Sequence, residues 1–252
     1  NVSLLGMPVE NDWILYAPYT DKSLMRNFLT FDLGRKMGNY CSRTIYCELV
    51  INGDYQGVYI LMEKIKRDKN RVDISDLDSD DLNGDSLTGG YIVKIDKFTG
   101  SGGSNWQSNF PNLGGGSTFI QYHYPEGPAL HPIQKNYIEN FVDSFENALS
   151  GPNFNDTLIG YSKYIDVNSF IDLYIINELS RNIDGYRLST YMYKDRDDKG
   201  GKLTMGPFWD YNLAYGNANY CGGGITSGWE VNGGCGDDNP FWFERLLDDT
   251  TY

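Results

Sequence analysis

The 252 residues carry a net charge of −13, and 40% of them are hydrophobic. The chain can therefore bury a full core, but it lacks the clustered basic charge that binding to nucleic acid requires. No apolar run reaches the roughly 18 residues of a membrane span, which excludes a transmembrane helix. The four cysteines form no CxxC pair and have no His at zinc-finger spacing, which argues against a zinc site. They can form two disulfides, Cys41–Cys47 and Cys221–Cys235, or remain free thiols.

The chain begins with a predicted strand within residues 11–19 and an amphipathic helix after it. Thr20 or Asp21 can cap that helix, whose apolar residues recur at helical spacing until it ends near Gly38. Arg26 lies beside the apolar face. It can be a surface residue with a buried stem or a partner for a phosphate or carboxylate.

A β-hairpin is the strongest local prediction. Two β-rich runs, 46–51 and 55–62, flank an Asn-Gly pair at 52–53, and this pair tolerates the positive φ of a tight turn. The second run is apolar nearly throughout, so we expect it to be buried on both faces. Glu63 at its end is either solvated or placed for a specific purpose. The basic run 64–71 follows and is either a solvated face or a docking site for a substrate.

The middle of the chain alternates between strands and polar loops. Residues 75–89 indicate a surface loop, and 89–97 indicate a strand in which Lys94 can reach a phosphate or lie at an exposed edge. Residues 100–116 predict a long Gly/Ser/Asn loop, a length that is uncommon unless the loop is functional or mobile. A strand over 119–124 and a helix over 133–149 complete this part.

Two acidic residues, Asp184 and Asp210, are the main candidates in the second half of the chain. An apolar helix over 170–179, expected to be buried, leads into a polar loop that contains Asp184, then a hairpin of strands, then Asp210. Asp210 and Asn212 supply two oxygen-bearing side chains at the end of a strand, which suits Mg²⁺ bound together with substrate phosphates. The alternative is a turn that closes a buried strand. The last segment, 241–247, starts a helix that the end of the chain interrupts, so we expect part of the fold to lie beyond it.

The order of helix, acidic loop, hairpin and acid is that of protein kinases. There, the first acid accepts the proton of the substrate hydroxyl and the second holds Mg²⁺ against the ATP phosphates. Asp184 and Asp210 would take these roles, although the flanking residues differ from the usual kinase triplets. Ser189 stands five residues after Asp184, where a typical kinase has a metal-binding Asn. No GxxxxGK[ST] motif occurs, which argues against a P-loop NTPase.

Four ordered motifs resemble the CotH kinase family, named for spore coat protein H. They occupy residues 16–27, 52–64, 182–187 and 208–217. The resemblance implies one α+β domain over residues 1–252 with an atypical protein-kinase-like fold. Its N-terminal antiparallel sheet lobe would end near residue 130, and a more helical C-terminal lobe would follow.

The resemblance also implies roles for individual residues. Asp184 looks like the catalytic acid and Lys94 like the phosphate-binding lysine, with Lys64 as its competitor. Glu63 would orient a lysine or a metal. Arg26 is a further candidate contact for the nucleotide, and the implied metal ligands are Asp210, Asn212 and Ser189.

The family's chemistry implies a secreted or surface kinase. It would transfer phosphate from ATP, with Mg²⁺ or Mn²⁺, to Ser or Thr hydroxyls of a Ser-rich, basic protein, in an extracellular location or on a cell or spore surface. Two alternatives remain: a pseudokinase, or an extracellular module that binds protein or glycan within a larger, for example cellulosome-like, protein. A hydrolase that uses Asp184 and Asp210 as paired acids is disfavoured, because the family supplies a better role for both.

Overall fold

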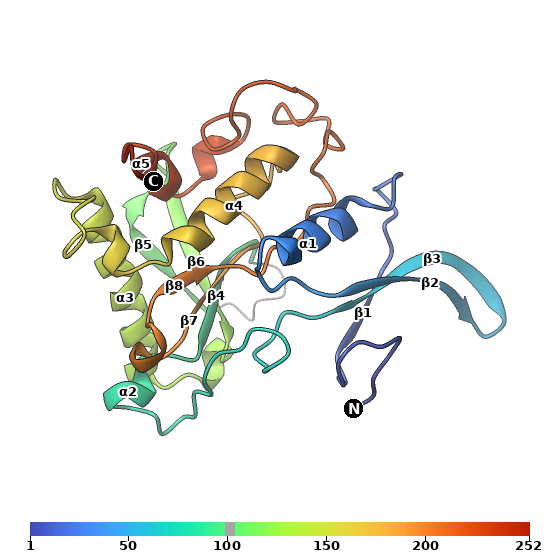
Figure 1. Ribbon diagram of the computed structural model, residues 1–252, viewed down its shortest axis with the longest axis horizontal. Coiled ribbons are helices and arrows are strands. Elements are labelled where there is room, and N and C mark those ends of the chain that lie inside the picture. Colours follow the sequence, from blue (N-terminus) through green and yellow to red (C-terminus); the bar gives the residue numbers. More distant parts are fainter. Residues whose placement is uncertain (99–103) are drawn as a thin grey trace.

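Two antiparallel sheets form the framework of the computed structural model, which describes residues 1–98 and 104–252 (Figure 1). The small sheet has the strand order β1-β3-β2 and the large sheet the order β5-β6-β4-β7-β8. The small sheet contains β1 (Trp13–Tyr16), β2 (Thr44–Ile51) and β3 (Asp54–Glu63). The large sheet contains β4 (Tyr91–Ile95), β5 (Asn105–Pro111), β6 (Ser117–Tyr124), β7 (Thr190–Lys194) and β8 (Leu203–Met205). This mixed architecture confirms the predicted α+β class.

The predicted hairpin is β2–β3, and its turn has the expected geometry. Asn52 and Gly53 both have positive φ, 53° and 89°, which matches a tight hairpin turn. The prediction that β3 is buried on both faces is wrong for its first half. Residues 54–59 are exposed or half-buried, because the hairpin projects away from the rest of the molecule (Figure 1). Only Ile60–Glu63 enter the core.

The large sheet combines strands from both halves of the chain. Its central strand β4 pairs with β6 on one side and with β7 on the other. The sheet therefore takes strands from both sides of residue 130, and the division into two lobes near that residue stays a prediction. The long loop predicted for 100–116 is wrong for residues 105–111, which form β5 because they pair with β6. Residues 100–103 lie outside the described residues.

Five α-helices lie among the described residues: α1 (Arg26–Lys36), α2 (Gly84–Leu87), α3 (Pro132–Ser150), α4 (Val167–Ser180) and α5 (Trp242–Leu246). α3 contacts β5 and α5, while α4 packs on β8 and α1. Phe145 on α3 meets Phe170 on α4 at 5.8 Å and Trp242 on α5 at 5.4 Å between ring centroids. All three rings are fully buried, so this aromatic cluster joins the helices across the core.

Two predictions about helices need correction. α1 begins at Arg26, not near Asp21, because the Asp21 carboxylate accepts hydrogen bonds from the backbone N–H groups of Ser23 and Arg26 and so folds the preceding segment into turns. α4 is not buried all round, because Ile175 and Leu179 are 46% and 66% exposed.

The cysteines form one disulfide, Cys221–Cys235, which confirms one of the two predicted pairs. The predicted Cys41–Cys47 bond is wrong, and both residues are free thiols. Cys41 is fully buried beside Phe208, whereas Cys47 lies on β2 opposite Tyr59. The fold therefore directs the two side chains into different environments.

Candidate active site

Three carboxylates gather at one end of the large sheet. Asp96 directly follows β4, Asp184 lies in the loop between α4 and β7, and Asp210 follows β8. Burial raises the pKa of Asp210, and the charges of Asp184 and Asp96 raise it further, while Lys97 opposes them. Asp210 is therefore close enough to both other acids to interact with them electrostatically, although Asp96 lies more than a hundred residues before it in the sequence.

Asp210 is held in an uncommon backbone conformation by its neighbours. Its φ is +61°, in the left-handed region that is uncommon for residues other than glycine, although Asp adopts it more readily than most. The next residue, Tyr211, is fixed at both ends, since its N–H donates to Asn27 Oδ1 at 2.6 Å and its hydroxyl to Asn177 Oδ1 at 2.8 Å. Asn27 belongs to α1 and Asn177 to α4, so two helices together position the Asp210 carboxylate.

Asp184 is placed by the end of α4. The helix stops where Arg181 adopts a left-handed conformation with φ of 47°, a common way to end a helix. The side chain of Asn182 then accepts a hydrogen bond from the Asp184 N–H at 3.3 Å. Arg187 Nη2 donates to Asp184 Oδ1 at 2.7 Å. This ion pair was not foreseen from the sequence.

Lys94 connects the sheet to the acidic cluster. Its Nζ donates to Asp96 Oδ2 at 2.9 Å and lies 5.6 Å from the ring centroid of Tyr191 on β7. Asp96 Oδ1 also accepts the backbone N–H of Ser189 at 3.4 Å. Asp96 was missed, although it could have been found: it lies two residues after Lys94, and alternate residues of a strand share a face.

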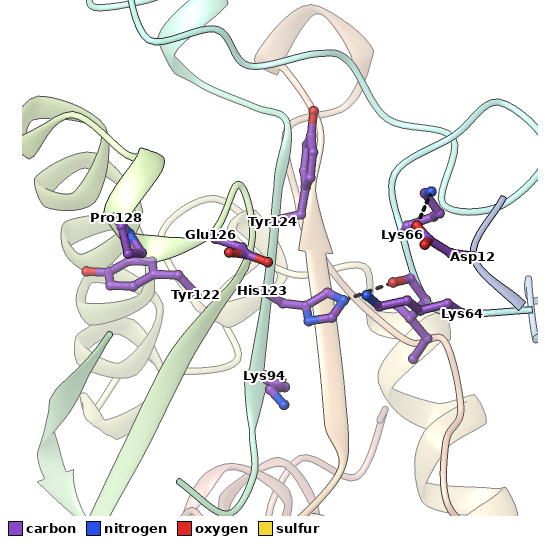
Figure 2. Close-up of a pocket in the computed structure, with 10 residues that line it drawn as sticks. Asp12, Lys64, Lys66, Lys94, Tyr122, His123, Tyr124, Glu126 and Pro128 are labelled. Atoms are coloured by element: carbon purple, nitrogen blue, oxygen red, sulfur yellow. Dashed lines mark hydrogen bonds and ion pairs between the residues drawn. The ribbon is translucent and has the colours of Figure 1, made fainter. Parts of the chain in front are cut away.

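A cavity of about 480 Å³ lies beside Lys94, between the two sheets (Figure 2). Both competing lysines line it: Lys64 just after β3, and Lys94 on β4. The remaining lining residues are Asp12, Ile65, Lys66, Tyr122, His123, Tyr124, Glu126 and Pro128. The volume is within the usual range for small-molecule sites. Burial lowers the pKa of His123, whose Nε2 lies 3.0 Å from the carbonyl oxygen of Ile65.

The family model described as CotH kinase protein matches residues 1–252, the whole chain. The chain belongs to the CotH kinase family. This finding confirms the resemblance drawn from the four motifs and shows a kinase-like protein. No protein of curated function matches the chain. Within the described ranges, no helix is both long and apolar enough to cross a membrane.

In this CotH kinase family member, Glu63 occupies a buried ion-pair network. Its carboxylate is fully buried and contacts Arg43 at 2.9 Å and Arg71 at 3.1 Å. The Tyr40 hydroxyl donates to it at 3.3 Å. Among the described residues, no hydrogen bond or ion pair joins Glu63 to Lys64 or Lys94. Its role in orienting a lysine or a metal therefore stays a prediction.

Arg26 and Asn212 both support the segment that carries Asp210. Arg26 forms an ion pair with Asp21 and donates from Nε to the carbonyl oxygen of Ala214 at 3.0 Å. Burial raises the pKa of Tyr16, as does the charge of Asp210, while a hydrogen bond with Asn212 opposes the rise. Asn212 thus lies next to Asp210 as the i, i+2 spacing indicates, and Tyr16 is a further neighbour that the sequence did not single out.

The candidate donors for a metal ion are Asp210, Asn212 and Ser189. The described part of the chain contains no group of three or more His, Cys, Asp or Glu side chains arranged to hold a metal ion. Mg²⁺ needs fewer protein ligands than most metals, because it keeps several waters and binds substrate phosphates. Burial raises the pKa of Asp210 and the charges of Asp184 and Asp96 add to the rise, and a bound cation would oppose the repulsion between these carboxylates. Asp210 and Asn212 therefore fit Mg²⁺, whereas Ser189 presents its backbone N–H to Asp96.

Proposed function

We propose that this member of the CotH kinase family transfers the γ-phosphate of ATP to Ser or Thr hydroxyls of a protein. One observation carries the proposal: Asp210 interacts electrostatically with Asp184 and Asp96 at the end of the sheet, and Lys94, which donates to Asp96, lines the cavity of about 480 Å³. A kinase needs a proton acceptor, a metal-binding acid and a phosphate-binding cation in one place.

The reaction assigns a task to each of these groups. ATP would enter the cavity with its phosphates near Lys64 and Lys94, whose ammonium groups oppose the charge on the γ-phosphoryl oxygens. The substrate hydroxyl oxygen forms the new bond to phosphorus, the bond to the bridging oxygen breaks, and ADP leaves. The hydroxyl proton passes to the Asp184 carboxylate. Mg²⁺ or Mn²⁺, held by Asp210 and Asn212, would neutralise phosphate charge.

We also propose an extracellular site or a cell or spore surface as the place of action. The Cys221–Cys235 disulfide supports this location, since such bonds persist mainly in oxidising compartments. The net charge of −13 favours a basic protein as substrate, and transfer to hydroxyls favours one rich in Ser.

The alternative proposal is a protein that still binds a partner but no longer transfers phosphate. The exposed side chain of Trp229, stacked on Tyr174 at 6.0 Å between ring centroids, favours a surface that binds protein or glycan. A pseudokinase or binding module within a larger protein would use that surface without turnover.

Thermal unfolding with ATP and Mg²⁺ or Mn²⁺ tests nucleotide binding. At ligand concentrations of about 100 times Kd, stabilisation is about 2.7 kcal/mol, or roughly 5–10 °C for a chain of this length. We expect this shift for wild type and for the control Asp198→Ala, an exposed acid. We expect Asp210→Ala to lose it. Absence of a metal-dependent shift in the wild type would contradict the proposal.

Transfer of labelled phosphate to a Ser-rich basic peptide separates a kinase from a binding module. We expect Asp184→Asn to retain the thermal shift and to lose the transfer. Wild-type binding without transfer would favour the pseudokinase, and glycan binding without any nucleotide effect would favour the surface around Trp229.

A further inference from the structure

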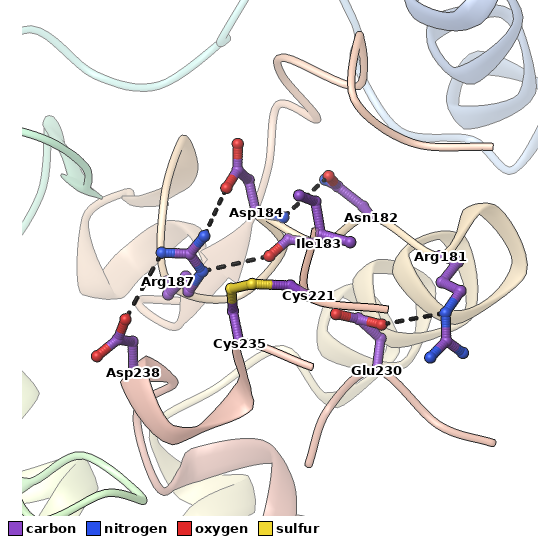
Figure 3. The surroundings of a disulfide bond; sticks show 9 residues. All are labelled: Arg181, Asn182, Ile183, Asp184, Arg187, Cys221, Glu230, Cys235 and Asp238. Atoms are coloured by element: carbon purple, nitrogen blue, oxygen red, sulfur yellow. Dashed lines mark hydrogen bonds and ion pairs between the residues drawn. A yellow bond between two sulfur atoms is a disulfide. The ribbon is translucent and has the colours of Figure 1, made fainter. Parts of the chain in front are cut away.

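Arg187 makes three contacts, two with the loop of the proposed catalytic acid and one with Asp238 (Figure 3). Its Nη2 donates to Asp184 Oδ1 at 2.7 Å, and its Nε donates to the carbonyl oxygen of Ile183 at 3.2 Å. Its Nη1 lies 3.7 Å from Asp238 Oδ2. The side chains of Arg187 and Asp184 are each only 14% exposed. Their ion pair is therefore screened by water much less than a surface pair.

These contacts restrain one oxygen of the Asp184 carboxylate and leave the other available. Among the described residues, Oδ1 has the guanidinium as partner, while Oδ2 has no hydrogen bond. A general base must present a free oxygen within hydrogen-bond reach of the proton that it takes. The planar guanidinium, fixed at the same time by Ile183 and Asp238, holds the carboxylate in one orientation.

The disulfide-closed segment 221–235 packs against the same loop. Arg181 Nε donates to the carbonyl oxygen of Gly222 at 2.9 Å, and the Gly223 backbone lies so close to Ile183 that an added Cβ would come within 3.2 Å of Ile183 Cγ2. Ile183 is buried and directly precedes Asp184.

Two further bonds tie the far end of this segment to α4. Glu178 accepts the N–H groups of Glu230 at 2.6 Å and Val231 at 2.8 Å. Asp238, the third partner of Arg187, lies three residues after Cys235. The disulfide-closed segment thus contacts Arg181 and Ile183 before the acid, and Asp238, just beyond the segment, contacts Arg187 after it.

We infer that Arg187 is a positioning residue for Asp184, and that the Cys221–Cys235 disulfide supports it by fixing the segment on which Arg181 and Ile183 pack. The inference rests on the proposed kinase function. Within the described chain, the Arg187 side chain bonds neither to the residues that line the cavity nor to the proposed metal ligands, since its partners are Asp184, Ile183 and Asp238. Its loss should therefore lower the rate of transfer without weakening ATP binding.

Kinetics of Arg187 variants test the positioning role. A misplacement of about 1 Å costs roughly 100-fold in rate, so we expect Arg187→Gln to lower kcat by about 10–100-fold with an unchanged KM for ATP. Arg187→Lys keeps the charge but not the planar fork and should recover part of the loss. Arg196→Gln is the matched control, since Arg196 also bonds a carbonyl oxygen and pairs with an acid, Asp81, away from the site. Wild-type kcat in Arg187→Gln would overturn the inference.

Hydrogen exchange of residues 182–188 gives a readout that needs no activity. The Leu188 N–H donates to the Asp184 carbonyl oxygen at 3.0 Å, and its exchange should be faster in Arg187→Gln. If Arg187→Gln does not fold, Asp238→Asn, at an exposed position, takes its place. We expect the Leu188 N–H to exchange faster in that variant too, by a smaller factor. Unchanged exchange in the folded variants would also overturn the inference.

The disulfide is tested by Cys221→Ser combined with Cys235→Ser. We expect faster exchange over 181–187 and a fall in kcat of several-fold, with Cys47→Ser, at a free thiol, as the control. Reduction of the wild type should reproduce the loss. If neither kcat nor the exchange rate changes, the disulfide has no part in positioning Asp184. Absence of transfer in the wild type would refute the proposed function instead, and the exchange data would still decide the positioning of Asp184.

Discussion

Glu146 is a carboxylate in the core, and its protonation should control stability. It lies on α3 and is 2% exposed. The Ser108 hydroxyl is 2.8 Å from each carboxylate oxygen, and Trp242 Nε1 donates to Oε1 at 2.8 Å. Burial raises the pKa of Glu146 from 4.5 to about 7, against the two hydrogen bonds, and the charge of Asp143 adds to the rise.

The sign of the pH dependence follows from this difference in pKa. Between pH 4.5 and about 7, the folded protein holds a proton on Glu146 that the unfolded chain has released. The stabilising contribution is therefore complete below pH 4.5 and is lost as the pH rises through about 7. The difference between the two pKa values corresponds to about 3 kcal/mol of unfolding free energy.

Glu146→Gln should remove this loss, because the amide stays neutral and can still accept from Trp242 and donate to Ser108. We expect the variant to match the wild type near pH 5 and to exceed its unfolding free energy by up to about 3 kcal/mol at pH 8. Urea unfolding at both pH values, with the disulfide intact, measures the difference. Glu244→Gln, the same change at an exposed position of α5, is the control.

An identical pH dependence in Glu146→Gln and wild type would refute the reasoning. Burial also raises the pKa of Glu230 to about 7. Both proteins should therefore retain some decline in stability towards pH 8, and only the difference between them reports on Glu146.

Three further predictions concern the ion-pair network, the core and the cavity. Glu63→Gln should cost about 3 kcal/mol because it leaves the buried Arg71 partly unpaired; thermal unfolding measures this, and a loss below about 1 kcal/mol contradicts it. Phe145→Ala should cost about 3–5 kcal/mol through the cavity that it leaves, and urea unfolding with little change would argue against the packing described. Lys94→Met and Lys64→Met should each raise the KM for ATP about tenfold or more, and an unchanged KM in both would exclude the cavity as the nucleotide site.

The sequence predicted the elements whose signals are local. The Asn-Gly pair at 52–53 fixed the hairpin because only a few residues tolerate its backbone angles, and helical periodicity located α3 within one residue of its ends. β5 was missed because its neighbours are rich in glycine and serine, while the pairing that makes it a strand comes from β6. α1 was extended too far because the Asp21 cap acts from five residues before the helix.

The candidate site shows the same difference between local signals, which the sequence contains, and contacts across the fold, which it does not. Asp184 and Asp210 were found from the order of elements, and the structure brings them within electrostatic reach of each other. Arg187 was missed because its importance depends on the shape of one turn. The partners of Glu63 include Arg43, 20 positions before it, and only the folded chain shows that arginines surround it. Local pattern therefore locates single residues, whereas partners across the fold require the structure.

The pairing of β4 with β7 also has a consequence for synthesis of the chain. Tyr91 pairs with Lys194, about a hundred residues later. Until that later segment leaves the ribosome, one edge of β4 has no neighbour, and the buried Ile92 and Val93 have no finished core around them. Contacts of such long range slow folding and prolong the exposure of strand edges. Chaperone demand should therefore be greatest before β7 is made, and chains that stop short of β7 should aggregate.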